Sequence, residues 1–477
     1  MAAVLAPVTK ISSTSPAPIA QALAAFAADL AYDAIPEAVR ERAKHLILDA
    51  VGIAHASTHY DFAHRALSAV TELSAGGGDT PVIGQTVRLQ MRDAMLMNGI
   101  LVHGLDFDDT HANGIIHATA SCFPSALGTA AQAGLDGRAL LASYVAGIEV
   151  ATRLGAVAKG GFHQVGFHPT GLIGTFACTL IAGRQFGLNA QQMAMAQGIA
   201  LSVAAGSLEF LQDGAWTKRM HPGWAAVAGL TAATLARHGF KGPGAAYEGR
   251  FGLFNAYLGP LAKDCDLALA TAGLGEVWET GKVSVKPIAA CHFTHACADA
   301  AAILRDKHGI NPADIRSVRA LVPQEVIKTV CEPVATKKQP QNSYDAQFSI
   351  PYIVATALVK GRFGLADLDD AALANPAVLA LAQKVEYEID PNSPFPKYYS
   401  GEVVVTMKDG REFRHREEMN RGAADRPISG ADIEKKFMDN MLLAVSKSRA
   451  EEVRDLVLAL DGGIDAQDLE DGLAARG

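Results

Sequence analysis

Residues 170–188 read TGLIGTFACTLIAGRQFGL, and this stretch decides the fold. It is apolar on nearly every side of a helix, so we predict a helix that is buried all round. Three other stretches repeat the helical spacing of apolar residues, at 36–56, 136–158 and 221–240. The sequence therefore predicts a mainly helical structure from Pro18 to about Pro260.

Length and composition agree with several layers of closely packed helices. The chain has 477 residues, which is too many for a single core and predicts two or three domains. Hydrophobic residues make up 49% of the chain but aromatic residues only 6%, so small side chains dominate. Small side chains suit helices that pack closely against one another.

The pattern changes after about residue 265, where shorter stretches typical of strands begin. Predicted strands cover 277–285, 314–323 and 384–390, and a predicted β-hairpin covers 401–417. Asp409 and Gly410 form its turn. Helices are predicted between the strands, over 294–309 and 349–363, and a last helical stretch over 429–462 begins with Ser429 as N-cap.

We therefore predict a mainly α protein with a second, α+β domain. A flexible leader rich in Ser, Thr and Pro covers residues 1–15, and a large helical domain covers 16–266. A smaller α+β lid is inserted over 267–422, and the segment 423–477 returns to the helical domain.

Charge and targeting signals exclude several classes of partner. The net charge is −8 and there is no block rich in Lys and Arg, so no nucleic-acid partner is predicted. The N-terminus lacks the pattern of a secretory signal, and no run of eighteen uncharged apolar residues predicts a membrane span. The six cysteines are scattered without CxxC spacing, which favours a reducing cytoplasm. The Gly-rich pieces do not open a helix after a strand, so nucleotide binding is rejected.

Residues 101–121, LVHGLDFDDTHANGIIHATAS, concentrate polar groups in an apolar chain. The charged or titratable residues are His103, Asp106, Asp108, Asp109, His111 and His117. Three interpretations remain open for them. Asp109 or Thr110 could be the N-cap of a helix, the carboxylates and imidazoles could hold a divalent metal, or an Asp and a His could transfer protons. No second cluster of ligands stands at a recognisable spacing for the metal site.

Three further clusters lie at the ends of predicted elements, where sites are commonly built. His168 directly precedes Pro169 at the start of the buried helix, where the helix N-terminus attracts an anion. Lys218 and Arg219 stand among apolar neighbours at another helix start, and a partly buried cation needs an anionic partner such as a substrate carboxylate.

The last cluster joins a predicted strand to a helix. It contains Lys286, Cys291, His292 and His295. Taken alone, Cys291 is best explained as a small buried hydrophobic residue, because no nucleophile–base pattern is complete around it.

The motifs together resemble one known family. GLDFDDTH and GIIHATAS, GFHPTGLIGT, DGAWTKRMHPGWAA, KPIAACHFTH and AQFSIPYIVATAL occur in the order and approximate spacing of the MmgE/PrpD family, over residues 18 to 460. The resemblance implies a homodimer formed through the helical domain, a site between the domains, no metal and no other cofactor. It also implies site roles for Asp106 and Thr110 in the Asp-rich motif and for the matching residues His117, His168, Lys218 and Lys286.

Two departures from the family pattern stand out. Cys291 occupies the position of a histidine in cis-aconitate decarboxylase. The stretch after Thr110 lacks the Trp and the HPS sequence of the 2-methylcitrate dehydratases.

We therefore expect a lyase that moves a proton at the carbon next to a carboxylate of a small di- or tricarboxylate. The leading hypothesis is a 2-methylcitrate dehydratase-like hydro-lyase, followed by a dicarboxylate epimerase or isomerase and then a decarboxylase. Lys218, Arg219, Lys286 and His292 would hold carboxylates, and Thr110 and Cys291 would also contact the substrate. His168 or Asp106 would be the base, and His117 the acid. Outside the family, a divalent-metal hydrolase and a non-catalytic helical binding protein remain as alternatives.

Overall fold

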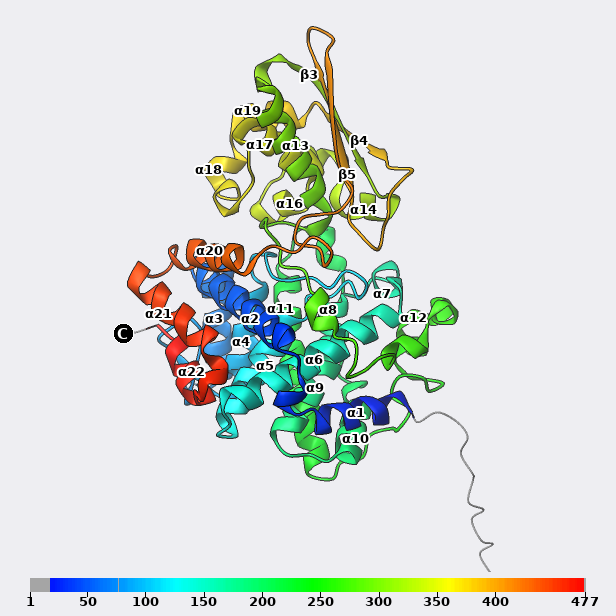
Figure 1. Cartoon of the computed structure of the whole chain (residues 1–477), viewed down its shortest axis with the longest axis vertical. Coiled ribbons are helices and arrows are strands. Elements are labelled where there is room, and N and C mark those ends of the chain that lie inside the picture. The colour runs from blue at the N-terminus through cyan, green and yellow to red at the C-terminus, as the bar shows by residue number, and fades with distance from the viewer. Residues whose placement is uncertain (1–17, 76, 476–477) are drawn as a thin grey trace, which may run out of the picture.

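The structure is a computed structural model of the chain and describes residues 18–75 and 77–475. The predicted leader at 1–15 lies outside the described residues. Figure 1 shows a large helical part and, above it, a smaller part in which helices pack on a sheet. The predicted fold class, mainly α with a smaller α+β region, is confirmed.

The helical part is built from the first twelve helices. They are α1 (Ile19–Asp29), α2 (Glu37–Ser57), α3 (Asp61–Leu73), α4 (Met91–His103), α5 (Thr119–Gln132), α6 (Gly137–Val157), α7 (Gly161–Gln164), α8 (Pro169–Leu172), α9 (Gly174–Gln185), α10 (Ala190–Ala200), α11 (Thr217–Arg237) and α12 (Leu253–Leu258). A two-stranded ribbon, β1 (Thr80–Pro81) with β2 (Arg88–Leu89), lies between α3 and α4. The predicted helices at 36–56, 136–158 and 221–240 correspond to α2, α6 and α11.

The predicted buried helix forms the centre of this part as α8 and α9, and α9 packs against α5, α6, α10 and α11. Only Arg184 of α9 is not fully buried. Close approach depends on glycine at Gly229, where a Cβ atom would lie 2.6 Å from the backbone nitrogen of Thr179. The small residues noted in the sequence thus allow α9 and α11 to touch through their backbones.

One helix, α6, is long and apolar enough by composition to cross a membrane. It is almost entirely buried within the helical part, and it carries Glu149 and Arg153, which form an ion pair inside the fold. These are the properties of a core helix.

The α+β part contains one four-stranded sheet in the order β4-β3-β5-β6. Its elements are α13 (His295–His308), β3 (Ile315–Val322), α14 (Ile327–Val330), α15 (Val334–Lys338), α16 (Ser343–Gln347), α17 (Ile350–Lys360), α18 (Asp370–Leu373), α19 (Pro376–Ala382), β4 (Val385–Ile389), β5 (Gly401–Met407) and β6 (Glu412–Glu417). β3 runs parallel to β4 and antiparallel to β5, and α13 and α17 pack against the sheet and each other. The predicted strands at 314–323 and 384–390 and the hairpin at 401–417 are confirmed, and Gly410 supplies the left-handed turn at φ +90°.

The predicted strand at 277–285 is wrong. Residues Glu279–Lys282 form a 3₁₀ turn instead. The buried carboxylate of Glu149 accepts hydrogen bonds from the backbone nitrogens of Glu279 and Thr280 and from the Thr280 hydroxyl. These bonds curl the chain around a single carboxylate, so only Ser284 remains to pair with Thr110 across a β-bridge.

The chain returns to its N-terminal helices through α20 (Gly430–Met441), α21 (Lys447–Leu458) and α22 (Ala466–Leu473). α20 and α21 pack on α2, and α22 packs on α5, so the C-terminal helices lie beside helices from the first part of the chain (Figure 1). Ser429 caps α20, as predicted, by accepting a hydrogen bond from the backbone nitrogen of Asp432. Gly52 of α2 lets the Phe437 ring approach closely.

Candidate active site

The polar stretch noted in the sequence is a loop, residues 104–118, between α4 and α5. Its backbone is strained, because Asp106 and Ile115 have φ values of +50° and +47°, a region that few non-glycine residues adopt. The predicted N-cap role of Asp109 or Thr110 is wrong, since Ala118 precedes α5. Asp109 still accepts the backbone N–H of Thr119, at 3.4 Å.

Asp106 lies between two lysine ammonium groups that come from distant parts of the chain. Its Oδ1 atom accepts hydrogen bonds from Lys218 of α11 and, at 3.0 Å, from Lys286 at the start of the α+β part. Lys286 also donates to the Asp106 backbone carbonyl at 2.8 Å. Burial opposes the negative charge, but Lys218 and Lys286 outweigh it and hold the pKa of Asp106 well below its usual range. The two predicted carboxylate-binding lysines thus meet at one point.

Three imidazoles gather beside these ion pairs. The ring centroids of His103, His117 and His168 lie 5.0 to 5.9 Å apart, and one nitrogen of each ring lies within 4.8 Å of the others. The Nδ1 atom of each ring has a partner elsewhere, which leaves Nε2 free to face a ligand. His103 Nδ1 lies 2.7 Å from Asp108 Oδ2, and His168 Nδ1 lies 3.0 Å from Nδ1 of His221.

His117 is held by the loop itself. Its Nδ1 donates to the backbone carbonyl of Asp109 at 2.6 Å and lies 3.2 Å from the hydroxyl of Thr110. Its backbone nitrogen donates to the Thr170 hydroxyl at 3.1 Å. Thr110 therefore orients an imidazole, while its backbone pairs with Ser284 and joins the loop to the α+β part.

Burial keeps the imidazoles neutral. It lowers the pKa of His103 and, reinforced by nearby cations, places the pKa values of His117 and His168 well below their usual range. Burial and the charge of Asp108 raise the pKa of Asp109 to about 7. The site therefore combines unprotonated bases with a carboxyl group that titrates near neutral pH, which is an arrangement suited to proton transfer.

Two predicted cations do not form ion pairs. Arg219 donates from Nε to the carbonyl of Gly104 at 2.7 Å, and its guanidinium lies 4.5 Å from the Phe62 ring centroid and 5.1 Å from that of Tyr344. Burial and Lys286 lower the pKa of His292 to about 3. Without substrate the buried, neutral ring offers only a hydrogen bond, and the role of His292 in holding a carboxylate stays a prediction.

Cys291 and His292 approach the site from the α+β part. The Cys291 backbone nitrogen donates to the Gln347 carbonyl at 2.9 Å. Burial and Asp106 raise the pKa of the Cys291 thiol to about 11, so it is protonated and a poor nucleophile at neutral pH. His292 Nε2 accepts a hydrogen bond from Asn420 at 2.7 Å.

Several residues that the fold brings here had no role predicted from the sequence. Asp108 orients His103, His221 supports His168, and the buried hydroxyl of Tyr344 has no hydrogen-bond partner among the residues that the structure describes. Gln347 ties α16 to the loop by donating to the Leu105 carbonyl. The family motif at residues 346–358 includes Gln347, but spacing in the sequence could not predict that this segment contacts the loop at 104–118.

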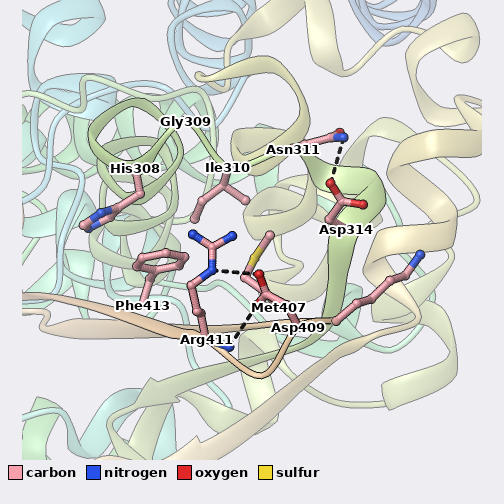
Figure 2. A pocket seen from close by; sticks show the side chains of 10 residues that line it. His308, Gly309, Ile310, Asn311, Asp314, Met407, Asp409, Arg411 and Phe413 are labelled. Atoms are coloured by element: carbon pink, nitrogen blue, oxygen red, sulfur yellow. Dashed lines mark hydrogen bonds and ion pairs between the residues drawn. The ribbon is translucent and has the colours of Figure 1, made fainter.

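Several hollows lie away from the imidazoles. Figure 2 shows one of ≈ 220 Å³ near the β5–β6 turn of the α+β part, where Arg411 pairs with Asp409 at 2.7 Å and the His308 ring stacks on Phe413. Its acidic and basic groups include no pair poised for proton transfer. The imidazoles with the Asp106 ion pairs are therefore the better candidate for an active site.

Comparisons with known proteins match both parts of the chain. Residues 21–265 match the model of the MmgE/PrpD N-terminal domain, and residues 288–462 match that of the MmgE/PrpD C-terminal domain. Cis-aconitate decarboxylase of Homo sapiens is 30% identical over 453 residues, covering 92% of this chain and 89% of that protein. Cis-aconitate decarboxylases of Mus musculus and Aspergillus terreus (strain NIH 2624 / FGSC A1156) are 27% and 28% identical, over 95% and 91% of this chain and 91% and 92% of their own lengths.

Proposed function

Because this chain belongs to the MmgE/PrpD family, we propose that it is a metal-independent lyase that acts on a small di- or tricarboxylate. One observation carries the proposal: two buried lysines share one aspartate beside three neutral imidazoles, of which His103 and His168 are buried and His117 is half-buried. Lysine ammonium groups bind carboxylates, and neutral imidazoles accept protons.

Substrate binding would redistribute the charges around Asp106. A substrate carboxylate shares or replaces Asp106 as the partner of Lys218 and Lys286, which fixes the carbon next to that carboxylate. His168 is favoured as the base over Asp106, because the His168 imidazole is neutral and pairs with no cation in the described part of the chain. The Asp106 carboxylate, by contrast, is already held by Lys218 and Lys286. Substrate negative charge raises imidazole pKa values, so His117 can take up a proton and act as the acid.

Decarboxylation is the reaction that the relatives support, since those compared are named cis-aconitate decarboxylases. The bond to the departing carboxylate breaks and carbon dioxide leaves. The electron pair stays on the substrate carbon and is stabilised by the carboxylate that the lysines hold. Protonated His117 then donates its proton to that carbon.

Dehydration of a 2-methylcitrate-like substrate is the second candidate. It is retained because Cys291 stands where the resemblance gives the decarboxylases a histidine. His168 would take the proton from carbon, the electron pair would form the double bond, and hydroxide would leave as water with a proton from His117.

A substrate panel in D₂O tests the proposal. The chelator-treated protein is incubated with cis-aconitate, 2-methylcitrate and simple dicarboxylates, and the reactions are followed by NMR. We expect turnover of at least one polycarboxylate without added metal, with one deuteron in the product for decarboxylation. Proton exchange without net loss would indicate an epimerase. Binding without any exchange would indicate a non-catalytic binding protein, and activity restored only by one divalent ion would indicate a metal-dependent enzyme.

The proposal includes a cytoplasmic homodimer formed through the helical part. An exposed apolar stripe on α11 supports a protein interface there, since Trp216, Met220 and Trp224 are 45%, 43% and 42% exposed at successive turns. Light scattering during gel filtration should give a mass of two chains for the wild-type protein. Trp224→Glu should lower the measured mass to that of one chain. A monomeric wild-type protein would contradict the dimer.

A further inference from the structure

We propose that His103, His117 and His168 also bind a divalent transition-metal ion of the Zn²⁺ or Co²⁺ type, and that the bound ion inhibits the reaction. The binding site is independent of the proposed function. The inhibition rests on it, because the ion would occupy the imidazole nitrogens that transfer protons.

The geometry is close to that of a three-histidine site. One nitrogen from each ring lies within 4.8 Å of the other two. Zinc–nitrogen bonds of about 2.0–2.1 Å in a tetrahedron place the nitrogens about 3.4 Å apart, so ring movements on the order of 1 Å would close the site. Such movements are small for side chains that come from two loops and a helix end.

His103 and His117 are held as metal-binding histidines usually are. The Nδ1 atom of His103 lies against the Asp108 carboxylate, and that of His117 lies against the Asp109 backbone carbonyl. The Nδ1 atom of His168 faces His221. Such partners fix the tautomer and direct Nε2 toward a ligand. His103 Nε2 is buried and lacks a hydrogen-bond partner within residues 18–75 and 77–475.

The surroundings also permit a dication. Buried imidazoles favour the neutral form, which is the form that binds metals. The positive charges of Lys218 and Lys286 face the negative charges of Asp106 and Asp108, so the site does not carry a large excess of positive charge. Three protein ligands leave a fourth position for water or a carboxylate oxygen.

Cobalt titration of the chelator-treated, full-length protein tests binding directly. It must be done without polycarboxylates, because these chelate the ion. We expect one Co²⁺ per chain with the intense visible absorption of tetrahedral cobalt. His103→Gln and His168→Gln should each weaken binding on the order of 100-fold or more, and Asp108→Asn about 10- to 100-fold.

Two matched controls separate this site from others. His238 is exposed at the end of α11, so His238→Gln should leave cobalt binding unchanged. Cys291→Ser should also keep the spectrum, which excludes a thiolate ligand. Weak binding, more than one equivalent, or binding that the two imidazole variants leave unchanged would overturn the proposed site.

Activity provides the second half of the test. Zn²⁺ held at a fixed free concentration by a metal buffer, in the presence of the chelating substrate, should inhibit turnover, and a stronger chelator should reverse the inhibition. Activation by the ion, or full activity with the site occupied, would overturn the inhibitory role. A protein that binds cobalt as expected but converts no polycarboxylate refutes the lyase proposal alone, whereas an active protein without the cobalt site refutes this inference alone.

Discussion

Charged side chains are buried around the loop at 104–118 but exposed on the outer face of the four-stranded sheet. At and beneath the loop, charged side chains are buried: Lys218 and Asp106 are 6% and 3% exposed. On the outer face of the sheet, Arg319 and its partner Glu388 are 39% and 47% exposed. Buried ion pairs are costly to desolvate and costly to break, while exposed pairs contribute little. The difference indicates that the loop retains its charges for chemistry and the sheet for solubility.

The strongest test of this contrast removes the imidazoles. His117→Gln and His168→Gln should fold normally and lose about 10²- to 10⁴-fold in turnover, because acid–base groups typically contribute that much. Thermal melts are measured beside kinetics, with His238→Gln as the control. If both variants melt early but turn over normally per folded molecule, these rings are structural.

Breaking a buried ion pair beneath the loop should have the next largest effect, and this effect is on the free energy of unfolding. Lys436 of α20 lies 2.7 Å from Asp49 and donates to the Phe107 carbonyl at 2.8 Å. Lys436→Met leaves Asp49 buried without a cation and should lower the free energy of unfolding by about 3–5 kcal/mol. Urea denaturation measures this loss. Lys435→Met, at an exposed neighbour on the same helix, should change it little.

Lys218→Ala should act mainly on catalysis, because Asp106 keeps Lys286 as an ion-pair partner at 3.0 Å and is not left buried without a cation. Loss of one charge-assisted carboxylate contact costs on the order of 2–4 kcal/mol of transition-state stabilisation, or roughly 30- to 1,000-fold in kcat/KM. The exposed Lys241→Ala is the matched control. Near-normal kinetics for Lys218→Ala would show that the substrate does not reach this ammonium group.

Asp109 should make stability depend on pH. Its pKa is raised to about 7 in the folded protein, from an ordinary value of 3.8, so its contribution is complete below about pH 4 and is lost as the pH rises through 7. Between pH 5 and 8 this amounts to about 2–3 kcal/mol. The unfolding free energy of wild type minus that of Asp109→Asn should fall over this range. A difference that stays flat would show that Asp109 is ionised throughout.

The smallest effect is expected on the sheet. Arg319→Ala removes exposed contacts to Glu388 and Glu412 and should change the free energy of unfolding by less than about 1 kcal/mol. A loss as large as that of Lys436→Met would contradict the distinction between the two regions.

Sequence periodicity was sufficient to predict elements whose signal is local. The helices α2, α6 and α11 and the β5–β6 hairpin follow from repeats of apolar residues and from a Gly turn. The false strand at 277–285 has a long-range cause, because its conformation is set by Glu149, about 130 residues earlier in the chain.

For the candidate site, the sequence could predict which residue types take part but not how they are arranged. The sequence identified the residue types, but the meeting of Lys218 and Lys286 at Asp106 depends on tertiary packing. Burial, which no short motif records, decides that His292 is neutral. The partnership of Asp49 with Lys436 spans 387 residues and has no local signature.

That last pair also bears on how the protein is made. At about 5–20 residues per second, a ribosome needs roughly 20–80 s to add the residues between Asp49 and Lys436. During this interval α2 has neither the cation for its buried carboxylate nor the Phe437 ring that packs at Gly52. The helical part is therefore completed only after almost the whole chain has emerged, and a nascent or prematurely terminated chain offers α2 as a surface for chaperones to bind.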